Sequence, residues 1–193
     1  MKQNYLATYR ILFVIVLTGI PLHAVQAQTA RGQYIRASIG FGMSAPYEDV
    51  DIDGTGMYAQ GEYLFNMRSW FSLRPYAGVI FTKTRKSGDD YRDRDYKVTS
   101  NAFLLGGKAR FTAPIPWVAP YLETGVGASL GSFETYIPSV HIKKNGILWH
   151  IPLSLGLLVG PRHDVDIGLV YYYHPSAEQF SGALAFGLSF PIR

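Results

Sequence analysis

The sequence predicts an all-β fold: an eight-stranded antiparallel transmembrane β-barrel of up-and-down topology that follows an N-terminal signal peptide. Three observations predict it. Eight segments alternate between apolar and polar residues, the connections between them alternate between short and long, and an apolar run near the N-terminus looks like an export signal. The expected domains are a signal peptide over residues 1–27 and a transmembrane β-barrel domain of the outer-membrane type over residues 28–193.

Composition limits the function classes. The 193 residues are enough for one domain, and the absence of cysteine excludes disulfides, thiolate metal sites and cysteine nucleophiles. Hydrophobic residues make up 48% of the chain, yet they alternate with polar ones instead of forming the long runs of a helical membrane protein. The formal charge of +4 is spread along the chain without a basic stripe, so no nucleic-acid partner is expected.

The N-terminus has the three parts of a secretory signal. Lys2 and Arg10 precede an apolar run over residues 11–20, and small residues lead up to Ala27. We expect cleavage between Ala27 and Gln28. The alternative is an uncleaved membrane anchor, but the run is short for a bilayer crossing.

The eight alternating segments carry the fold prediction, because successive side chains of a strand point to opposite faces. One face of each segment carries bulky apolar residues, and the other carries glycine, serine and charged residues. The fourth segment is less regular, since Ala102 and Leu104 fall on its polar face. The segments lie near residues 34–43, 57–67, 70–83, 97–111, 119–131, 146–159, 163–174 and 179–192.

The connections alternate in length. Three are short, over residues 66–69, 112–116 and 160–163. Four are expected to be longer loops, over residues 44–56, 84–96, 132–145 and 175–178, although the last is short for its class. Short turns at one end and longer loops at the other are typical of bacterial outer-membrane barrels, whose short turns face the periplasm.

Two barrel types compete, and the size of the side chains distinguishes them. A soluble lipocalin-type barrel would turn its bulky apolar side chains inward, whereas here the face with small and charged residues is suited to a narrow interior. Eight charged residues are predicted to line that interior as a network of structural ion pairs: Arg36, Glu62, Arg74, Lys108, Arg110, Glu123, Asp164 and Asp166. The alternative reading of this network is a proton or small-solute path.

The alternation over residues 32–193 and the closing segment 182–190 resemble the small outer-membrane β-barrel domain family, the OmpX- and OmpA-like barrels. The match departs at the C-terminus, where residues 191–193 follow the last aromatic residue. The resemblance implies location in the bacterial outer membrane and contact with its lipid and lipopolysaccharide. It also implies insertion by the barrel-assembly machinery. It implies no cofactor, and it leaves the oligomeric state open, with a monomer as the expectation.

A narrower resemblance concerns the segments 120–127 and 189–192, which are similar to lipid A 3-O-deacylases of the PagL type. His174-Pro175-Ser176 matches their His-x-Ser motif, which implies Ser176 as nucleophile and His174 as base. The orienting acid is the departure, because Gly182 stands where the family carries Glu on the last strand, and Glu178 lies in the preceding loop.

Two loop segments have weaker patterns. Asp49, Asp51 and Asp53 alternate in a way that suits calcium, but the closing glutamate of an EF-hand loop is absent, and a solvated acidic loop is the preferred interpretation. The segment 85–97 mixes both charges and is interpreted as a surface loop, with contact to lipopolysaccharide phosphates as the alternative. No metal site is expected.

These patterns favour a non-enzymatic outer-membrane protein with a structural role or a role in surface interactions through its external loops. The first alternative is a lipid A acyl hydrolase that uses His174 and Ser176, with Glu178 as the nearest acid. The second is a narrow pore, which the small interior of an eight-stranded barrel disfavours.

Overall fold

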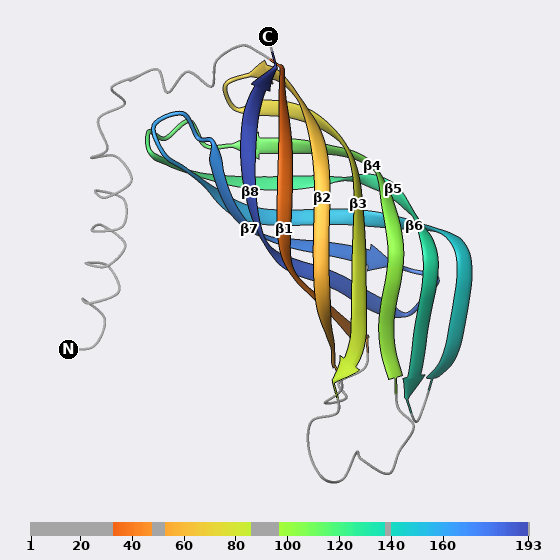
Figure 1. The fold of residues 1–193 in the computed structure, drawn as a ribbon. Coiled ribbons are helices and arrows are strands. Elements are labelled where there is room, and N and C mark those ends of the chain that lie inside the picture. The colour runs from red at the N-terminus through yellow and green to blue at the C-terminus, as the bar shows by residue number, and fades with distance from the viewer. Residues whose placement is uncertain (1–32, 48–52, 86–96, 138–139, 193) are drawn as a thin grey trace, which may run out of the picture.

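In a computed structural model, which describes residues 33–47, 53–85, 97–137 and 140–192, eight strands form one closed sheet (Figure 1). The strands are β1 (Gln33–Pro46), β2 (Asp53–Arg68), β3 (Phe71–Arg85), β4 (Lys97–Thr112), β5 (Val118–Ile137), β6 (Val140–Val159), β7 (Val165–His174) and β8 (Gln179–Ile192). The predicted cleavage site at Ala27 and Gln28, and the loop residues Asp49 and Asp51, lie outside the described residues.

The prediction of eight antiparallel strands that close into a barrel is confirmed. Each strand pairs with its neighbours in sequence, and β1 pairs with β8 to close the sheet. A row of paired residues followed once around the barrel returns to β1 ten residues farther along, from Gln33 to Met43. The row passes through Gln33, Phe65, Leu73, Ala109, Thr124, Leu153, Tyr171, Gly182 and Met43. A stagger of this kind requires strands tilted by roughly 35–45° to the barrel axis.

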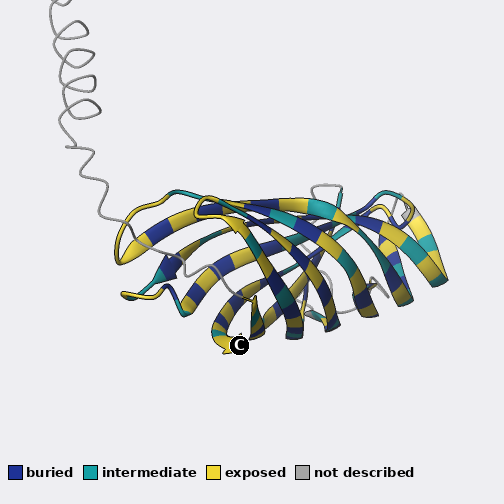
Figure 2. Ribbon diagram, turned by 90° about the horizontal axis from the view of Figure 1, so that it is seen from above, coloured by how far each residue is buried: buried dark blue, intermediate teal, exposed yellow. Residues whose placement is uncertain are grey.

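The bulky apolar side chains point outward, as the alternation predicts. Figure 2 shows buried and exposed residues alternating along each strand. Phe41 is 71% exposed, Met57 74% and Ile147 75%, whereas the charged side chain of Arg110, which points into the barrel, is 1% exposed. The outer surface is therefore apolar and the interior polar, which is the reverse of a soluble barrel.

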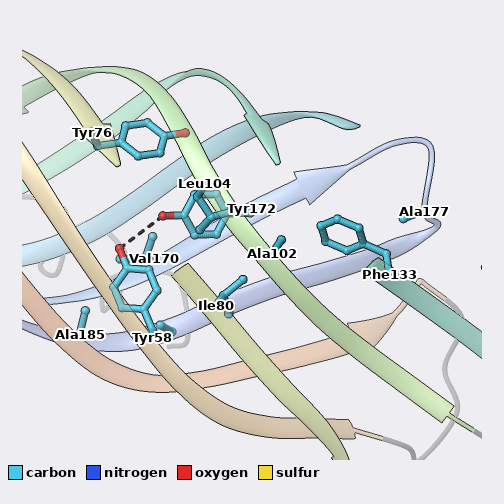
Figure 3. Close-up of a cluster of buried hydrophobic side chains, with 11 residues drawn as sticks. Tyr58, Tyr76, Ile80, Ala102, Leu104, Phe133, Val170, Tyr172, Ala177 and Ala185 are labelled. Atoms are coloured by element: carbon cyan, nitrogen blue, oxygen red, sulfur yellow. Dashed lines mark hydrogen bonds between the residues drawn. The ribbon is translucent and has the colours of Figure 1, made fainter. Parts of the chain in front are cut away.

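The interior also contains an apolar layer. Figure 3 shows Tyr58 and Tyr172 joined by a hydrogen bond of 3.3 Å between their hydroxyl groups, with Ile80 and Leu104 close by. Ala102 and Leu104, which appeared irregular in the sequence, are 2% and 0% exposed in this layer. The interior is thus not polar throughout, because apolar side chains from several strands fill its middle.

The expectation of a long loop over residues 132–145 was wrong. β5 continues to Ile137 and β6 begins at Val140, so nearly the whole segment is a β-hairpin. Phe133 is 1% exposed and Ile137 0%, so the alternation of β5 continues past Gly131. β1 and β2 likewise extend into the predicted loop 44–56, as far as Pro46 and from Asp53.

Among the described residues, no helix has the length and hydropathy needed to cross a membrane.

Candidate functional site

A ring of buried charged residues lies inside the barrel, toward the end that carries the short turns. Its seven members are Arg36, Glu62, Arg74, Lys108, Arg110, Glu123 and Asp166, and none is more than 4% exposed. Four are cationic and three anionic, and they come from β1, β2, β3, β4, β5 and β7. The structure therefore brings together seven of the eight interior charges that the sequence identified.

Glu62 is a central acceptor of this ring. Its carboxylate lies 2.7 Å from Lys108 Nζ and 3.0 Å from Arg74 Nη1. Arg36 Nη1 is 3.5 Å away, and Gln60 Nε2 donates a hydrogen bond of 2.6 Å to the same carboxylate. Three cations and an amide therefore neutralise and solvate one buried carboxylate, which is what a charge in a narrow interior requires.

The sheet register creates one unfavourable pair, which the acidic residues offset. Arg74 on β3 lies directly opposite Lys108 on β4, and like charges at opposed positions repel. Glu62 contacts both cations from one side. Glu123 contacts both from the other, at 3.5 Å from Arg74 Nη1 and 3.2 Å from Lys108 Nζ. The two carboxylates thus bridge the two cations.

Asp166 links β7 to β1 across β8, the strand that lies between them. Its carboxylate lies 2.6 Å from Arg36 Nη2 on β1 and 2.8 Å from Arg110 Nη1 on β4. Tyr121 donates a hydrogen bond of 2.7 Å to the same group. β8, which lies between β7 and β1, leaves room for this contact at Gly187, where a Cβ atom would overlap the Arg36 guanidinium.

Asp164 is a correction to the predicted network. Although it has the same parity as Asp166, β7 begins only at Val165, so Asp164 lies in the turn beyond the barrel wall. Its side chain is 44% exposed, and its nearest cation is Arg162, at 3.9 Å. Alternation fixes the face of a residue but not the point where the strand ends.

A second polar cluster lies toward the end that carries the longer connections. Tyr76 Oη is 2.5 Å from His150 Nε2, and His150 Nδ1 is 2.7 Å from Ser129 Oγ. Ser129 Oγ is also 2.8 Å from His174 Nε2. Both imidazoles are fully buried. One serine hydroxyl therefore bridges two histidines, which holds β5, β6 and β7 together.

Inward-facing glycines make room for this cluster. A Cβ atom at Gly127 would overlap both Tyr76 Oη and His150 Nε2, and one at Gly106 would crowd Tyr76 Oη. Aromatic side chains can cross so narrow a barrel only where the facing position carries almost no side chain. The glycines of the polar faces are therefore packing residues.

The structure does not bring His174, Ser176 and Glu178 together as a triad. The ring of His174 is fully buried and packs on Phe133, with ring centroids 4.6 Å apart. Ser176 and Glu178 are exposed in the turn between β7 and β8. The hydroxyl that contacts the His174 ring is Ser129, since the hairpin that β5 forms covers this part of the interior.

Opposite walls of the barrel are bonded to one another at several levels. Tyr172 on β7 donates to Gln60 on β2 at 2.6 Å, and Ser100 on β4 is 2.6 Å from Ser181 on β8. Gln179 Nε2 donates to Ser100 Oγ at 2.8 Å. The polar groups of the interior thus tie opposite strands together. Among the described residues, no cluster of three or more histidine and acidic side chains is arranged to hold a metal ion.

Alternation along β5 and β6 is enough to place Ser129 and His150 on the interior face, but it does not group them with His174. Alternation along one strand shows which residues point inward. It does not show which strands face each other across the barrel, or at what height. The stagger of ten residues supplies that information, and it becomes known only from the pairing of all eight strands.

Solved structures share this architecture. The crystal structure of Neisserial surface protein A matches with 14% sequence identity and a TM-score of 0.58, over 83% of this chain and 97% of that one. The outer membrane protein OprG from Pseudomonas aeruginosa matches with 10% identity and a TM-score of 0.52, over 84% of this chain and 98% of that one. The chain therefore has the fold of the small outer-membrane β-barrels.

The outer membrane enzyme PagL also overlaps, with 12% identity and a TM-score of 0.46, over 82% of this chain and 99% of that one. An overlap of this size has no bearing on the reaction. No protein-family model matches the sequence. No curated protein matches it either. The likeness to small outer-membrane barrels is thus one of fold, and function has to be argued from the surfaces of this chain.

Proposed function

We propose that this chain is an integral protein of the bacterial outer membrane, without enzymatic activity, whose role is structural or lies in surface interactions at the end opposite its short turns. The apolar outer surface carries the proposal. Large apolar side chains are exposed on all eight strands, while every charged residue of the ring is buried. In water such a surface would aggregate, whereas in a bilayer it is solvated.

Aromatic residues at both ends of the barrel support the membrane placement. Toward the short turns, Trp70 and Phe71 pack on Phe111, with ring centroids 6.2 and 5.3 Å apart. Toward the other end, Tyr47 packs on Tyr173 and Phe180, with centroids 5.5 and 4.2 Å apart. Aromatic girdles at the two lipid–water interfaces are typical of membrane barrels.

Fluorescence quenching tests the membrane placement. Because the chain lacks cysteine, a single cysteine can carry a fluorophore. With the protein in vesicles of bromine-labelled phospholipid, we expect strong quenching at Leu155→Cys, which is outward-facing and 60% exposed, and weak quenching at the turn residue Ser69→Cys. Equal quenching at both positions would contradict the proposal.

The non-enzymatic part of the proposal rests on the position of His174. The ring of His174 is buried, and its contact is with Ser129, not with the exposed Ser176. Mass spectrometry of lipid A, from cells that express the wild type or Ser176→Ala at equal levels in the outer membrane, tests this part. We expect identical lipid A from both. Loss of an acyl chain with the wild type alone would make the chain a deacylase.

The export step has its own measurement. We propose that residues 1–27 are removed, so the N-terminal peptide of the protein isolated from outer membranes should begin at Gln28. Recovery of a peptide that includes Lys2 would indicate a retained anchor.

A further inference from the structure

β6 has an edge that no described strand covers. It is 20 residues long, but β7 has only 10, and the pairing of β6 with β7 begins at Ile151. On its other side β6 stays paired with β5 up to Val140. From Ile151 toward Val140, β6 therefore runs beyond the end of β7 with one edge free of any described strand. A strand edge presents a row of backbone N–H and C=O groups that can pair with another extended chain.

The segment 141–146 of this edge stands beyond the apolar surface. His141, Lys143, Lys144 and Asn145 are exposed there, whereas the apolar outer positions resume at Ile147. The segment contains no proline, a residue that would block pairing of the edge. Over six residues it offers roughly 20 Å of backbone.

Its charge is basic. Lys143 and Lys144 carry two positive charges, and Glu134 on β5 lies 3.9 Å from Lys143 Nζ. The Lys143 side chain is 61% exposed, so this contact leaves its ammonium open to a second partner. An extended chain laid along the edge would place its side chains beside these lysines.

We propose that the segment 141–146 of β6 is a docking edge for an extended, acidic polypeptide segment of a partner protein, which adds to the sheet as a further strand. Backbone hydrogen bonds would supply the affinity, and acidic side chains beside Lys143 and Lys144 the selectivity. This inference rests on the proposed function, because the edge meets a soluble partner only if this end of the barrel stands outside the membrane.

The charge favours this occupant over a second copy of the chain. Antiparallel pairing of two copies about this segment would bring Lys143 and Lys144 close to the same lysines of the other copy, and like charges across a strand pair repel. Lysines on edge strands protect a sheet from pairing with itself in this way.

The experiment measures binding of synthetic peptides to the purified wild-type barrel in lipid nanodiscs. The probe is a nine-residue peptide of alternating valine and glutamate. A further probe keeps this sequence but carries an N-methyl group on every residue, so that neither edge of the peptide can donate backbone hydrogen bonds. We expect the unmodified peptide to bind. The N-methylated peptide should lose binding, because it has the same charge but no backbone N–H group to pair with β6.

Two protein variants separate the edge from general charge attraction. Lys143→Glu combined with Lys144→Glu should weaken binding by about tenfold, since the lysine on the glutamate face of the added peptide is replaced by a repulsive carboxylate. The matched control is Lys83→Glu combined with Lys97→Glu, which changes the net charge equally at exposed positions on β3 and β4. It should leave the affinity within about twofold.

Four results would overturn the inference. Equal binding of the unmodified and the N-methylated peptide, or equal loss in both protein variants, would show attraction by charge alone. Concentration-dependent pairing of the barrel with no peptide binding would show that a second copy occupies the edge. The last result is failure of the peptide to bind a barrel whose fluorophore at Leu155→Cys is strongly quenched by bromine-labelled lipid. That result would refute the docking edge and leave the proposed membrane location intact.

Discussion

At the scale of single residues, a few side chains make many of the polar contacts in the interior. Glu62 contacts three cations that are themselves buried. Its replacement leaves them without one of their carboxylates, and an uncompensated buried charge is far more costly than a missing surface contact.

We therefore expect Glu62→Gln to lower the free energy of unfolding by about 3–5 kcal/mol. Urea unfolding of the barrel in phospholipid vesicles measures the change. Glu134→Gln is the matched control, because its partner Lys143 is 61% exposed and 3.9 Å away, and it should cost less than about 1 kcal/mol. Similar values for the two variants would mean that the ring contributes little to stability.

The inward glycines are a second feature at this scale. Gly127→Ala should destabilise the barrel by about 1–3 kcal/mol, because the new methyl group overlaps the Tyr76 and His150 side chains. Gly107→Ala, where no atom lies within 4 Å of the added Cβ, should be close to neutral in the same assay. Combining Gly127→Ala with Tyr76→Phe should recover part of the loss, since the phenol oxygen is one of the overlapping atoms. Failure to recover any would place the strain elsewhere.

At the scale of elements, the hairpin of β5 and β6 closes the barrel over the histidines. Phe133 packs on the His174 ring, and Thr135 donates hydrogen bonds to the carbonyl oxygen of Ala177 and to Gln179 Oε1, at 3.2 and 2.9 Å. The hairpin therefore leans across the interior toward the turn between β7 and β8.

Phe133→Ala should open this cover. We expect faster modification of His174 by a histidine-specific acylating reagent, read by peptide mass spectrometry, because the ring that shields it is removed. Phe103→Ala is the control, since Phe103 is outward-facing and 45% exposed, and it should leave the rate unchanged. An unchanged rate in Phe133→Ala would mean that other side chains keep the imidazole covered.

The same hairpin shows where sequence reasoning stops. The inside and outside faces of all eight strands were predictable, because alternation has a physical cause in the pleat. The hairpin was missed because the whole of residues 132–145 was assigned to a loop, although Ser132 and Asn145 pair with each other within the sheet. The grouping of Ser129 with His174 was missed because contacts across the barrel depend on the stagger between all eight strands.

At the scale of the whole molecule, the interior is filled from wall to wall. The charged ring lies toward one end, the tyrosines Tyr58 and Tyr172 occupy the middle, and the Phe133 hairpin covers the other end. An interior this narrow holds its own side chains and little else. The barrel in planar bilayers should give no stable single-channel steps. Steps of constant size that vanish on heat denaturation of the protein would establish the pore alternative.

The closure of β1 onto β8 has a consequence for how the chain folds. Gln33 pairs with Ile192, and Arg36 finds Asp166 only when the first and seventh strands lie one strand apart. These contacts join residues at opposite ends of the sequence, so the loop entropy of almost the whole chain is lost before they form. A topology dominated by such contacts folds slowly. A chain that lacks β8 would leave two long unpaired edges, and no smaller barrel is available to it.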